Sequence, residues 1–199
     1  MREIAESLDV REQGEISEQW YQIEVAHTRG VPNSTQATLD KTKAADEYGI
    51  ELTTKKNRRF DEVFGDENSA TIREYKHIKG KLQGDQLSQY DDNIKIIRHN
   101  RIIDTKVAQG IPLTQNKKDN PVIIEKDGKR FRPKKLMYTF ATPEGVRANA
   151  EFMREQLNIQ RNRSILSFEI VNGKGQRKTI KYSNRKQLNQ ANVDTFVNM

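Results

Sequence analysis

Two short segments, residues 58–64 and 70–78, are separated by a polar, glycine-containing stretch, and this pattern is typical of a β-hairpin with a tight turn. A hairpin with a defined turn dictates which side chains face each other. Counting outward from a four-residue turn at 66–69 places Asp61 directly opposite Glu74. No other feature of the chain constrains its local structure as closely.

One face of this hairpin is predicted to gather two acids and a lysine. Side chains alternate between the faces of a strand, so Lys76 shares the face of Glu74, whereas Arg73, Tyr75 and His77 point the other way. Like charges directly opposed on a sheet destabilise it unless a cation lies between them, so removing one carboxylate is expected to leave the protein at least as stable. Mg²⁺ prefers one or two carboxylates with water and phosphate oxygens, and a neighbouring lysine can assist an attacking water. The face therefore predicts a metal site for phosphate chemistry.

Periodicity predicts the elements around the hairpin. In the first half we expect helices over 15–28, over 34–48 with Ser34 as N-cap and Gly49 as its end, and over 86–98, with a first strand over 50–54. In the second half we expect a hairpin over 121–131 around Asp127-Gly128, a strand over 136–141, a helix from Thr142-Pro143 to Leu157, and a hairpin made by 165–171 and 179–182. The polar residues 183–199 are expected to be loosely held.

Charge is divided unevenly along the 199 residues. Residues 1–100 hold 15 Lys and Arg against 19 Asp and Glu, whereas residues 101–199 hold 20 against 9. A basic surface attracts phosphates without regard to sequence, so the second half is expected to meet a polyanion such as nucleic acid. The length predicts one main core, and a mean hydropathy of −0.92 indicates a very polar surface around it.

Composition excludes several other kinds of site. The sequence contains no cysteine, which excludes a thiolate nucleophile and any Cys-containing zinc site. His27, His77 and His99 have neither H-E-x-x-H nor H-x-H spacing, which argues against a histidine zinc site. No apolar run approaches 18 residues, and the acidic N-terminus is unlike a signal peptide. We therefore expect a soluble protein without a membrane partner, in the cytoplasm of its own cell or delivered into that of a target cell.

Residues 61–76 resemble a known group. Asp61, followed after twelve residues by Glu74-Tyr75-Lys76 on a hairpin flanked by helices, resembles the PD-(D/E)XK, or restriction-endonuclease-like, nuclease superfamily. The resemblance covers residues 34–98 and implies an α/β (α+β) fold, a mixed sheet flanked by helices, here with a basic C-terminal extension rich in β-hairpins. It implies a Mg²⁺-dependent endonuclease in which Asp61 and Glu74 bind Mg²⁺ or Mn²⁺ with the Tyr75 carbonyl, while Lys76 assists the attack of water on a phosphodiester.

Other positions of the resemblance stay open. Members often carry a glutamine on the following helix near the site, and Gln86 fills that role here, with Gln89 one turn on as the alternative. Phe60 replaces the proline that usually precedes the aspartate. Asp66 is an alternative to Asp61 in another register, but it lies in the predicted turn. Members often also use an acid from an earlier helix, and the candidates are Glu18, Glu24, Asp40 and Glu47.

The resemblance also implies a domain division and partners. We expect an N-terminal helical segment over 1–33, a nuclease domain over 34–182 with its catalytic core at 34–98, and a polar tail over 183–199. The expected partner is nucleic acid, DNA rather than RNA. The chain is similar to the nuclease domains of bacterial polymorphic toxins and secreted effectors, for which the charge predicts an acidic immunity protein, and a phage, mobile-element or repair-type nuclease is the alternative. The residues expected to contact phosphates are Arg59, Lys79, Lys81, Lys129, Arg130, Lys134 and Lys135.

Two other functions compete with the nuclease. The basic second half can serve a nucleic-acid-binding protein without enzymatic activity, which would leave phosphodiesters intact when Mg²⁺ is added. His77 or His99, acting with Glu74 as acid and base, can serve a metal-independent ribonuclease whose activity EDTA would not change.

Overall fold

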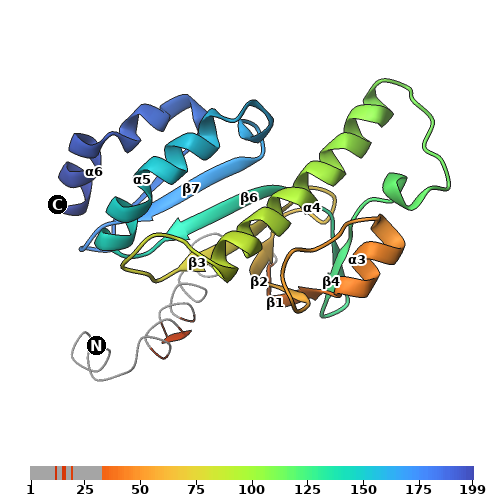
Figure 1. Cartoon of the computed structure of the whole chain (residues 1–199), viewed down its shortest axis with the longest axis horizontal. Helices are drawn as coiled ribbons and strands as arrows, with labels where there is room; N and C mark the ends of the chain where they lie inside the picture. Colours follow the sequence, from red (N-terminus) through yellow and green to blue (C-terminus); the bar gives the residue numbers. More distant parts are fainter. Residues whose placement is uncertain (1–11, 13–14, 17–18, 20–32) are drawn as a thin grey trace.

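A six-stranded mixed sheet forms the centre of the protein, as the computed structural model shows for the residues it describes, 33–199 together with 12, 15, 16 and 19 (Figure 1). Its spatial order is β1 (Asn33–Leu39), β2 (Arg58–Phe64), β3 (Ala70–Lys76), β6 (Pro133–Phe140), β7 (Leu166–Val171) and β8 (Arg177–Ile180). The pairs β1–β2 and β2–β3 are antiparallel, β6 and β7 continue parallel to β3, and β8 returns antiparallel. The mixed α+β class expected from the sequence is therefore confirmed.

Two long helices, α4 (Asp85–Ala108) and α5 (Pro143–Asn158), cover one face of this sheet (Figure 1). The ring of Tyr90 on α4 packs edge-on against Tyr138 of β6 at 5.4 Å and against Phe152 of α5 at 5.1 Å, measured between ring centroids. Phe152 also meets Phe168 of β7 at 6.3 Å. Aromatic contacts of this kind join both helices to the parallel strands, so the main core lies between this face and the helices.

The helix expected over 34–48, with Ser34 as its N-cap, is wrong in its first half. Residues 33–39 form the edge strand β1, because Ala37 and Leu39 are buried at a spacing of two, which suits a strand. The helix α3 (Lys41–Tyr48) begins only after Asp40, whose side chain accepts a hydrogen bond from the Lys43 amide at 2.8 Å. It ends, as expected, at Gly49, which has a φ of 66°.

The strand expected over 50–54 is also wrong. The amides of Thr53 and Thr54 donate to the side chain of Asp92 on α4, at 2.6 and 3.0 Å, and pair with no neighbouring strand. The Asp92 side chain thus accepts the hydrogen bonds that these amides would otherwise donate to a neighbouring strand. The helix expected over 15–28 lies mostly outside the described residues, although residues 15, 16 and 19 are helical.

In the second half of the chain, the observed elements agree more closely with those expected from the sequence. A small hairpin of β4 (Ile124–Lys126) and β5 (Lys129–Phe131) turns at Asp127 and Gly128, whose φ angles of 53° and 74° are those that a two-residue turn requires. Thr142 caps α5, and Pro143 occupies its first turn. Short 3₁₀ helices link the elements, namely η1 (Lys117–Asp119), η2 (Gln160–Asn162) and η3 (Tyr182–Leu188).

The C-terminal residues are better ordered than expected. After η3 the chain forms α6 (Gln190–Val197), and Leu188, Val193 and Val197 are buried. Arg147 of α5 donates to Asp194 of α6 at 3.1 Å. The expectation of a loosely held tail was therefore wrong, since apolar residues among its Asn and Gln anchor it to α5.

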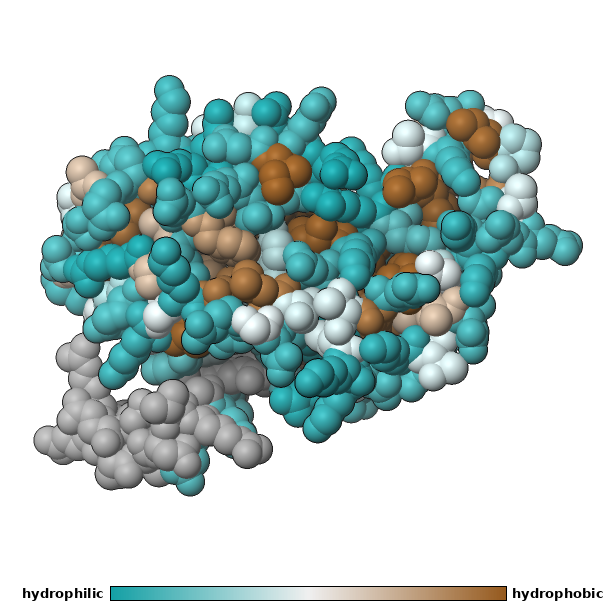
Figure 2. Space-filling model, viewed as in Figure 1, coloured by the Kyte–Doolittle hydropathy of each residue, from teal (hydrophilic) through white to brown (hydrophobic). Residues whose placement is uncertain are grey.

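The surface drawn in Figure 2 is largely hydrophilic, as the mean hydropathy indicates. Apolar patches stand out toward the projecting end of α4 and the segment after it, where the exposed apolar residues are Ile102, Val107, Ile111 and Leu113. No helix within the described residues is both long enough and apolar enough to cross a membrane.

Candidate active site

Asp61, Glu74 and Lys76 meet at the end of the β2–β3 hairpin, as the sequence predicted. The Nζ of Lys76 lies 3.3 Å from Glu74 Oε2 and 4.0 Å from Asp61 Oδ2. Both carboxylates therefore point to the same side of the sheet and reach the same ammonium group. Asp61 is on the second strand of the sheet, and the other two residues are on the third.

The register of the hairpin is the one counted from the turn, but the backbone ladder stops just short of the site. Glu62 pairs with Arg73, Val63 with Ile72 and Phe64 with Thr71. The next pair in this register would be Asp61 with Glu74, and no backbone pair forms there. The carboxylate of Asp61 instead accepts a hydrogen bond from the Tyr75 amide at 2.8 Å. A side chain thus closes the ladder, and the same oxygen, Oδ2, is the one that lies 4.0 Å from Lys76 Nζ.

Glu74 lies in a network of charged and polar groups that the sequence did not reveal. Its side chain is only 1% exposed, and Arg58, 3% exposed, forms an ion pair with its Oε1. Asn93 of α4 donates to the same oxygen at 3.2 Å and accepts from Arg58 Nε at 3.0 Å. The Arg58 guanidinium also lies 5.1 Å from the centre of the Phe60 ring. Two cations, Arg58 and Lys76, therefore balance the two carboxylates, so repulsion between the acids does not dominate.

Lys76 is oriented from three directions. Its Nζ lies 3.4 Å from Gln89 Oε1 on α4, in addition to the two carboxylates, and 5.5 Å from the centre of the Tyr138 ring. Burial raises the pKa of Tyr138 well above its ordinary value, and the nearby Glu74 carboxylate adds to the effect. Tyr138 is therefore a neutral wall of the site, while Gln89 supplies an oxygen that restrains the lysine.

A cleft of about 330 Å³ opens beside this cluster. Asp61 and Gln89 line it, as does Asp85 from the first turn of α4. The rest of its wall is made by the segment that leads into β2 and by the first two residues of that strand, namely Thr54, Lys55, Lys56, Asn57, Arg58 and Arg59. Solvent therefore reaches the site between the start of α4 and a basic segment.

The carboxylates of Asp61 and Glu74 suit a divalent cation. Within the part of the chain that the structure describes, no three His, Cys, Asp or Glu side chains gather as a metal site. Asp61 Oδ2 and Glu74 Oε2 nevertheless approach the same atom, Lys76 Nζ, at 4.0 and 3.3 Å. Since Mg²⁺ is usually held by one or two carboxylates with waters and phosphate oxygens, Asp61 and the Oε2 side of Glu74 fit Mg²⁺ or Mn²⁺.

Several residues singled out in the sequence lie away from this cluster or make no contact with it. No hydrogen bond joins the Gln86 side chain to Lys76, whereas Gln89, the alternative, lies 3.4 Å from Lys76 Nζ. Asp40 caps α3, Glu47 is exposed and pairs weakly with Lys43 at 3.9 Å, and Asp66 accepts from Asn68 within the turn. Glu18, Glu24 and His27 lie outside the described residues.

The two other histidines have separate surroundings. His99 Nε2 lies 2.8 Å from the Asn120 carbonyl, about three helical turns beyond Gln89. His77 is half-buried, and this burial, followed by the nearby Lys79, lowers its pKa. Arg73, on the opposite face of the hairpin, is buried and pairs with Glu62 at 2.6 Å, so the face opposite the site is not an exposed basic surface at that residue.

The predicted phosphate-contacting residues fall into two groups. Arg59 lines the cleft, and Lys79 and Lys81 follow β3 on an exposed loop at the same end of the sheet. Lys135 pairs with Thr71 in the sheet, five residues before Lys76, which places it roughly 16 Å away along the strand. Lys134 precedes it, and Lys129 and Arg130 lie on the small hairpin. The second group is thus at the far end of the sheet.

No family model, no curated protein and no solved structure matches this chain. Its function is therefore inferred from the geometry of the site and from the local pattern of residues 61–76.

Proposed function

We propose that the protein is a metal-dependent nuclease of the restriction-endonuclease-like type. The observation that carries the proposal is the position of Lys76 Nζ, 3.3 Å from Glu74, 3.4 Å from Gln89 and 4.0 Å from Asp61. An aspartate on the second strand, a glutamate and a lysine on the third, and a glutamine on the following helix are what the resemblance implies. The cleft beside them is open to a polymeric substrate.

The roles of the residues follow from their surroundings. Asp61 and Glu74 would hold Mg²⁺ or Mn²⁺, which when bound supplies a Lewis acid for a phosphoryl oxygen and lowers the pKa of water. Arg58 and Asn93 keep Glu74 in one orientation through its Oε1, which leaves Oε2 directed at the site. Lys76 places a positive charge where negative charge develops on the phosphate as water attacks and the P–O bond breaks. Gln89 orients Lys76.

The test is cleavage of supercoiled plasmid, linear duplex and RNA, each with Mg²⁺, Mn²⁺ or EDTA. We expect cleavage of DNA that requires a divalent ion and is lost in Asp61→Asn, Glu74→Gln and Lys76→Met. Asp66→Asn, which removes a carboxylate from the neighbouring turn, is the matched control and should remain active.

Metal-dependent cleavage that survives in Glu74→Gln would eliminate this site. Cleavage that EDTA leaves unchanged would favour the histidine-dependent ribonuclease, and binding without cleavage would favour the non-enzymatic alternative. A role as a toxin domain with an acidic immunity protein stays a prediction from the sequence resemblance.

A further inference from the structure

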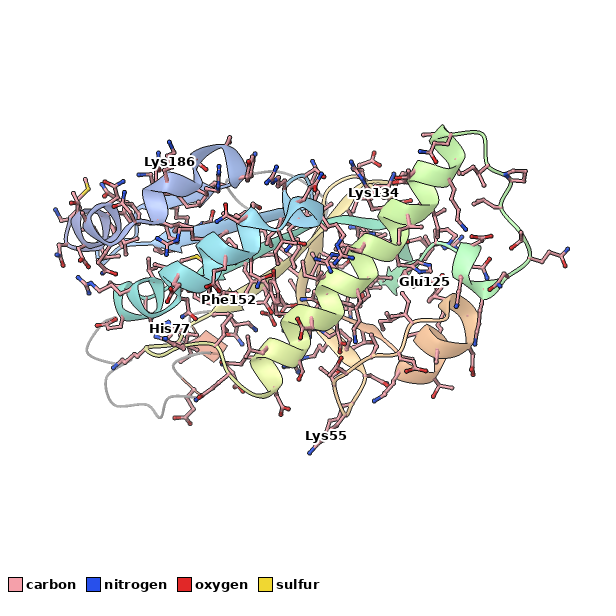
Figure 3. The ribbon with its side chains drawn as sticks, turned by 45° about the horizontal axis from the view of Figure 1, so that its top comes forward. Lys55, His77, Glu125, Lys134, Phe152 and Lys186 are labelled. Carbon is pink, nitrogen blue, oxygen red and sulfur yellow. The ribbon has the colours of Figure 1, made fainter. Side chains whose placement is uncertain are left out.

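Residues 55–59, which lead into β2 and include its first two residues, present three cations without an acidic partner among the described residues. Lys55, Lys56 and Arg59 are exposed and line the cleft that Asp61 and Gln89 also line. Among the described residues, no acidic side chain lies within ion-pairing distance of any of the three. Figure 3 shows Lys55 projecting outward from this segment. Three unpaired cations at the mouth of a site proposed for phosphate chemistry suggest that their partner is a ligand.

The part of this segment before β2, residues 53–57, is neither helix nor strand, yet it is held against α4 by hydrogen bonds. Asp92 is fully buried and accepts from the amides of Thr53 and Thr54 and from the Thr54 hydroxyl, at 2.6, 3.0 and 2.9 Å. Burial by itself would raise the pKa of Asp92, but these hydrogen bonds outweigh it and lower the pKa below its ordinary value. A buried carboxylate held by three donors indicates a segment with one preferred position.

Two lysines hold the same segment from its sides. Lys95, one turn beyond Asp92, donates to the Thr53 hydroxyl at 2.6 Å and to the Glu51 carbonyl at 3.2 Å. Lys41, at the start of α3, donates to the Thr54 carbonyl at 2.8 Å. Because α4 also carries Gln89, this scaffold sets the distance between the exposed cations and the catalytic cluster.

The chemistry of the cleft indicates which part of a nucleic acid these cations meet. None of the described residues that line it is aromatic. Proteins that hold single strands usually stack the bases on aromatic side chains, whereas Lys and Arg alone meet phosphates and leave the bases unread. This surface therefore suits a duplex, whose bases remain stacked inside and whose phosphates lie outside.

We infer that residues 53–59 form a phosphate-binding lip for the backbone of a double-stranded nucleic acid, in which Lys55, Lys56 and Arg59 contact phosphates and Asp92 is the positioning residue. The inference rests on the proposed function, because it assigns the substrate of the same site. It differs from the sequence expectation, which placed most phosphate contacts in the basic second half of the chain.

The test is binding of a fluorescent 20-bp duplex, followed by anisotropy in EDTA over a series of salt concentrations. Each lost phosphate contact lowers the slope of log affinity against log salt by about 0.9, so the triple variant Lys55→Ala, Lys56→Ala, Arg59→Ala should flatten it by about 3. The control removes three cations that are paired with Glu125 or Asp104, as Arg130→Ala, Arg132→Ala, Lys134→Ala. It has the same net charge and should keep the wild-type slope.

The substitution Asp92→Asn distinguishes a role of Asp92 in positioning the lip from the effect of its charge on the attraction of DNA. The substitution makes the protein more positive by one charge, which by itself would strengthen binding to DNA. If Asp92 holds the lip, binding should instead weaken several-fold, because an amide cannot accept from all three donors. Asp91→Asn, on the exposed neighbouring residue, makes the same charge change and should bind as the wild type or slightly tighter. If Asp92→Asn does not fold, Thr54→Val removes one of the three bonds and gives the same comparison.

The outcomes separate the two proposals. A triple variant with the wild-type slope, an Asp92→Asn protein that binds more tightly, or a single strand bound better than the duplex would overturn the inference, even if metal-dependent cleavage is observed. A flattened slope in a protein that never cleaves would support the lip and reject the nuclease. Equal loss with duplex DNA and duplex RNA would support contact with the backbone alone.

Discussion

Two basic regions at opposite ends of the sheet differ in what their charges face. At the far end, Arg132 and Lys134 both pair with Asp104 of α4, at 2.7 and 3.0 Å, and Figure 3 shows Lys134 beside the C-terminal half of that helix. Arg130 pairs with Glu125 at 3.2 Å. At the other end, the cations of the lip at residues 53–59 have no acidic partner among the described residues. Charge already neutralised within the protein attracts phosphate less than charge left unpaired.

The net charge of each half of the chain does not predict where the unpaired cations lie. The second half of the chain carries the excess of Lys and Arg, yet the lip comes from the first half, in which acids outnumber bases. Folding brings Asp104 to the basic strand β6 and leaves the lip beside the site. The position of a phosphate site therefore depends on which cations remain unpaired, a property that a sum over the sequence does not contain.

The largest expected difference between the two ends is in catalysis. Lys76→Met should lower the rate of metal-dependent cleavage by about 10³-fold or more, because it removes the charge that stabilises the transition state. Lys134→Met, which makes the same replacement on β6, should leave the rate near that of the wild type. Single-turnover cleavage of a duplex measures both. Similar losses in the two variants would mean that the chemistry does not depend on the cluster at Asp61.

The second difference is in stability. Glu74→Ala should lower the free energy of unfolding by about 3 to 5 kcal/mol, because it leaves the buried Arg58 without its partner. Glu125→Ala breaks an exposed pair and should cost less than about 1 kcal/mol. Urea unfolding compares them. Sequence reasoning expected removal of a carboxylate to relieve repulsion, so a Glu74→Ala protein as stable as the wild type would restore that view and reject the buried pair.

The third prediction concerns how the stability of the protein depends on pH. The pKa of Asp92 is lowered in the folded protein, so its ionised form contributes stability above the ordinary carboxyl pKa, and this contribution is lost as the pH falls below about 4. The stability of the wild type should therefore exceed that of Asp92→Asn at neutral pH and approach it in acid. Asp91→Asn should show no such convergence. Thermal unfolding between pH 7 and pH 3 measures the difference, and a gap that stays constant would contradict the role of the ionised carboxylate.

The smallest expected effect is that of removing a cation at the far end of the sheet, where Lys134 pairs with Asp104. Lys134→Ala removes one of two cations that face Asp104, and because these side chains are partly exposed the cost should be below about 1 kcal/mol. The salt slope of duplex binding should not change. A slope flattened by about 0.9 would show that this end also contacts a phosphate and would weaken the contrast between the two regions.

Local patterns in the sequence predicted what depends on neighbours along the chain. The hairpin register, the Asp127-Gly128 turn and the capped start of α5 follow from alternation and turn chemistry, and these predictions were confirmed. The convergence of Asp61, Glu74 and Lys76 follows from the same register. Residues 33–39 were misjudged because only Ala37 and Leu39 mark the spacing of two in an otherwise polar segment.

What the sequence could not reveal depends on contacts between distant segments. Asn93 lies 35 residues from Arg58, and Asp92 lies 39 residues from Thr53. On α4 each of them resembles any polar helical residue. Only the packing of α4 against the start of β2 makes Asn93 a support for Glu74 and Asp92 a support for the lip. The choice of Gln89 over Gln86 depends on the rotation of the same helix, which periodicity does not define to within one turn.

Because the Tyr75 amide donates a hydrogen bond to Asp61, its proton is a spectroscopic reporter of the site. An amide that donates to a carboxylate changes its NMR chemical shift when that carboxylate takes up a proton or a metal ion. The rate at which this amide proton exchanges with deuterium also reports how often the hydrogen bond to the carboxylate breaks. In a ¹⁵N spectrum, a titration followed at this single peak would therefore give the occupancy of the site without a substrate, and without any change to the chain.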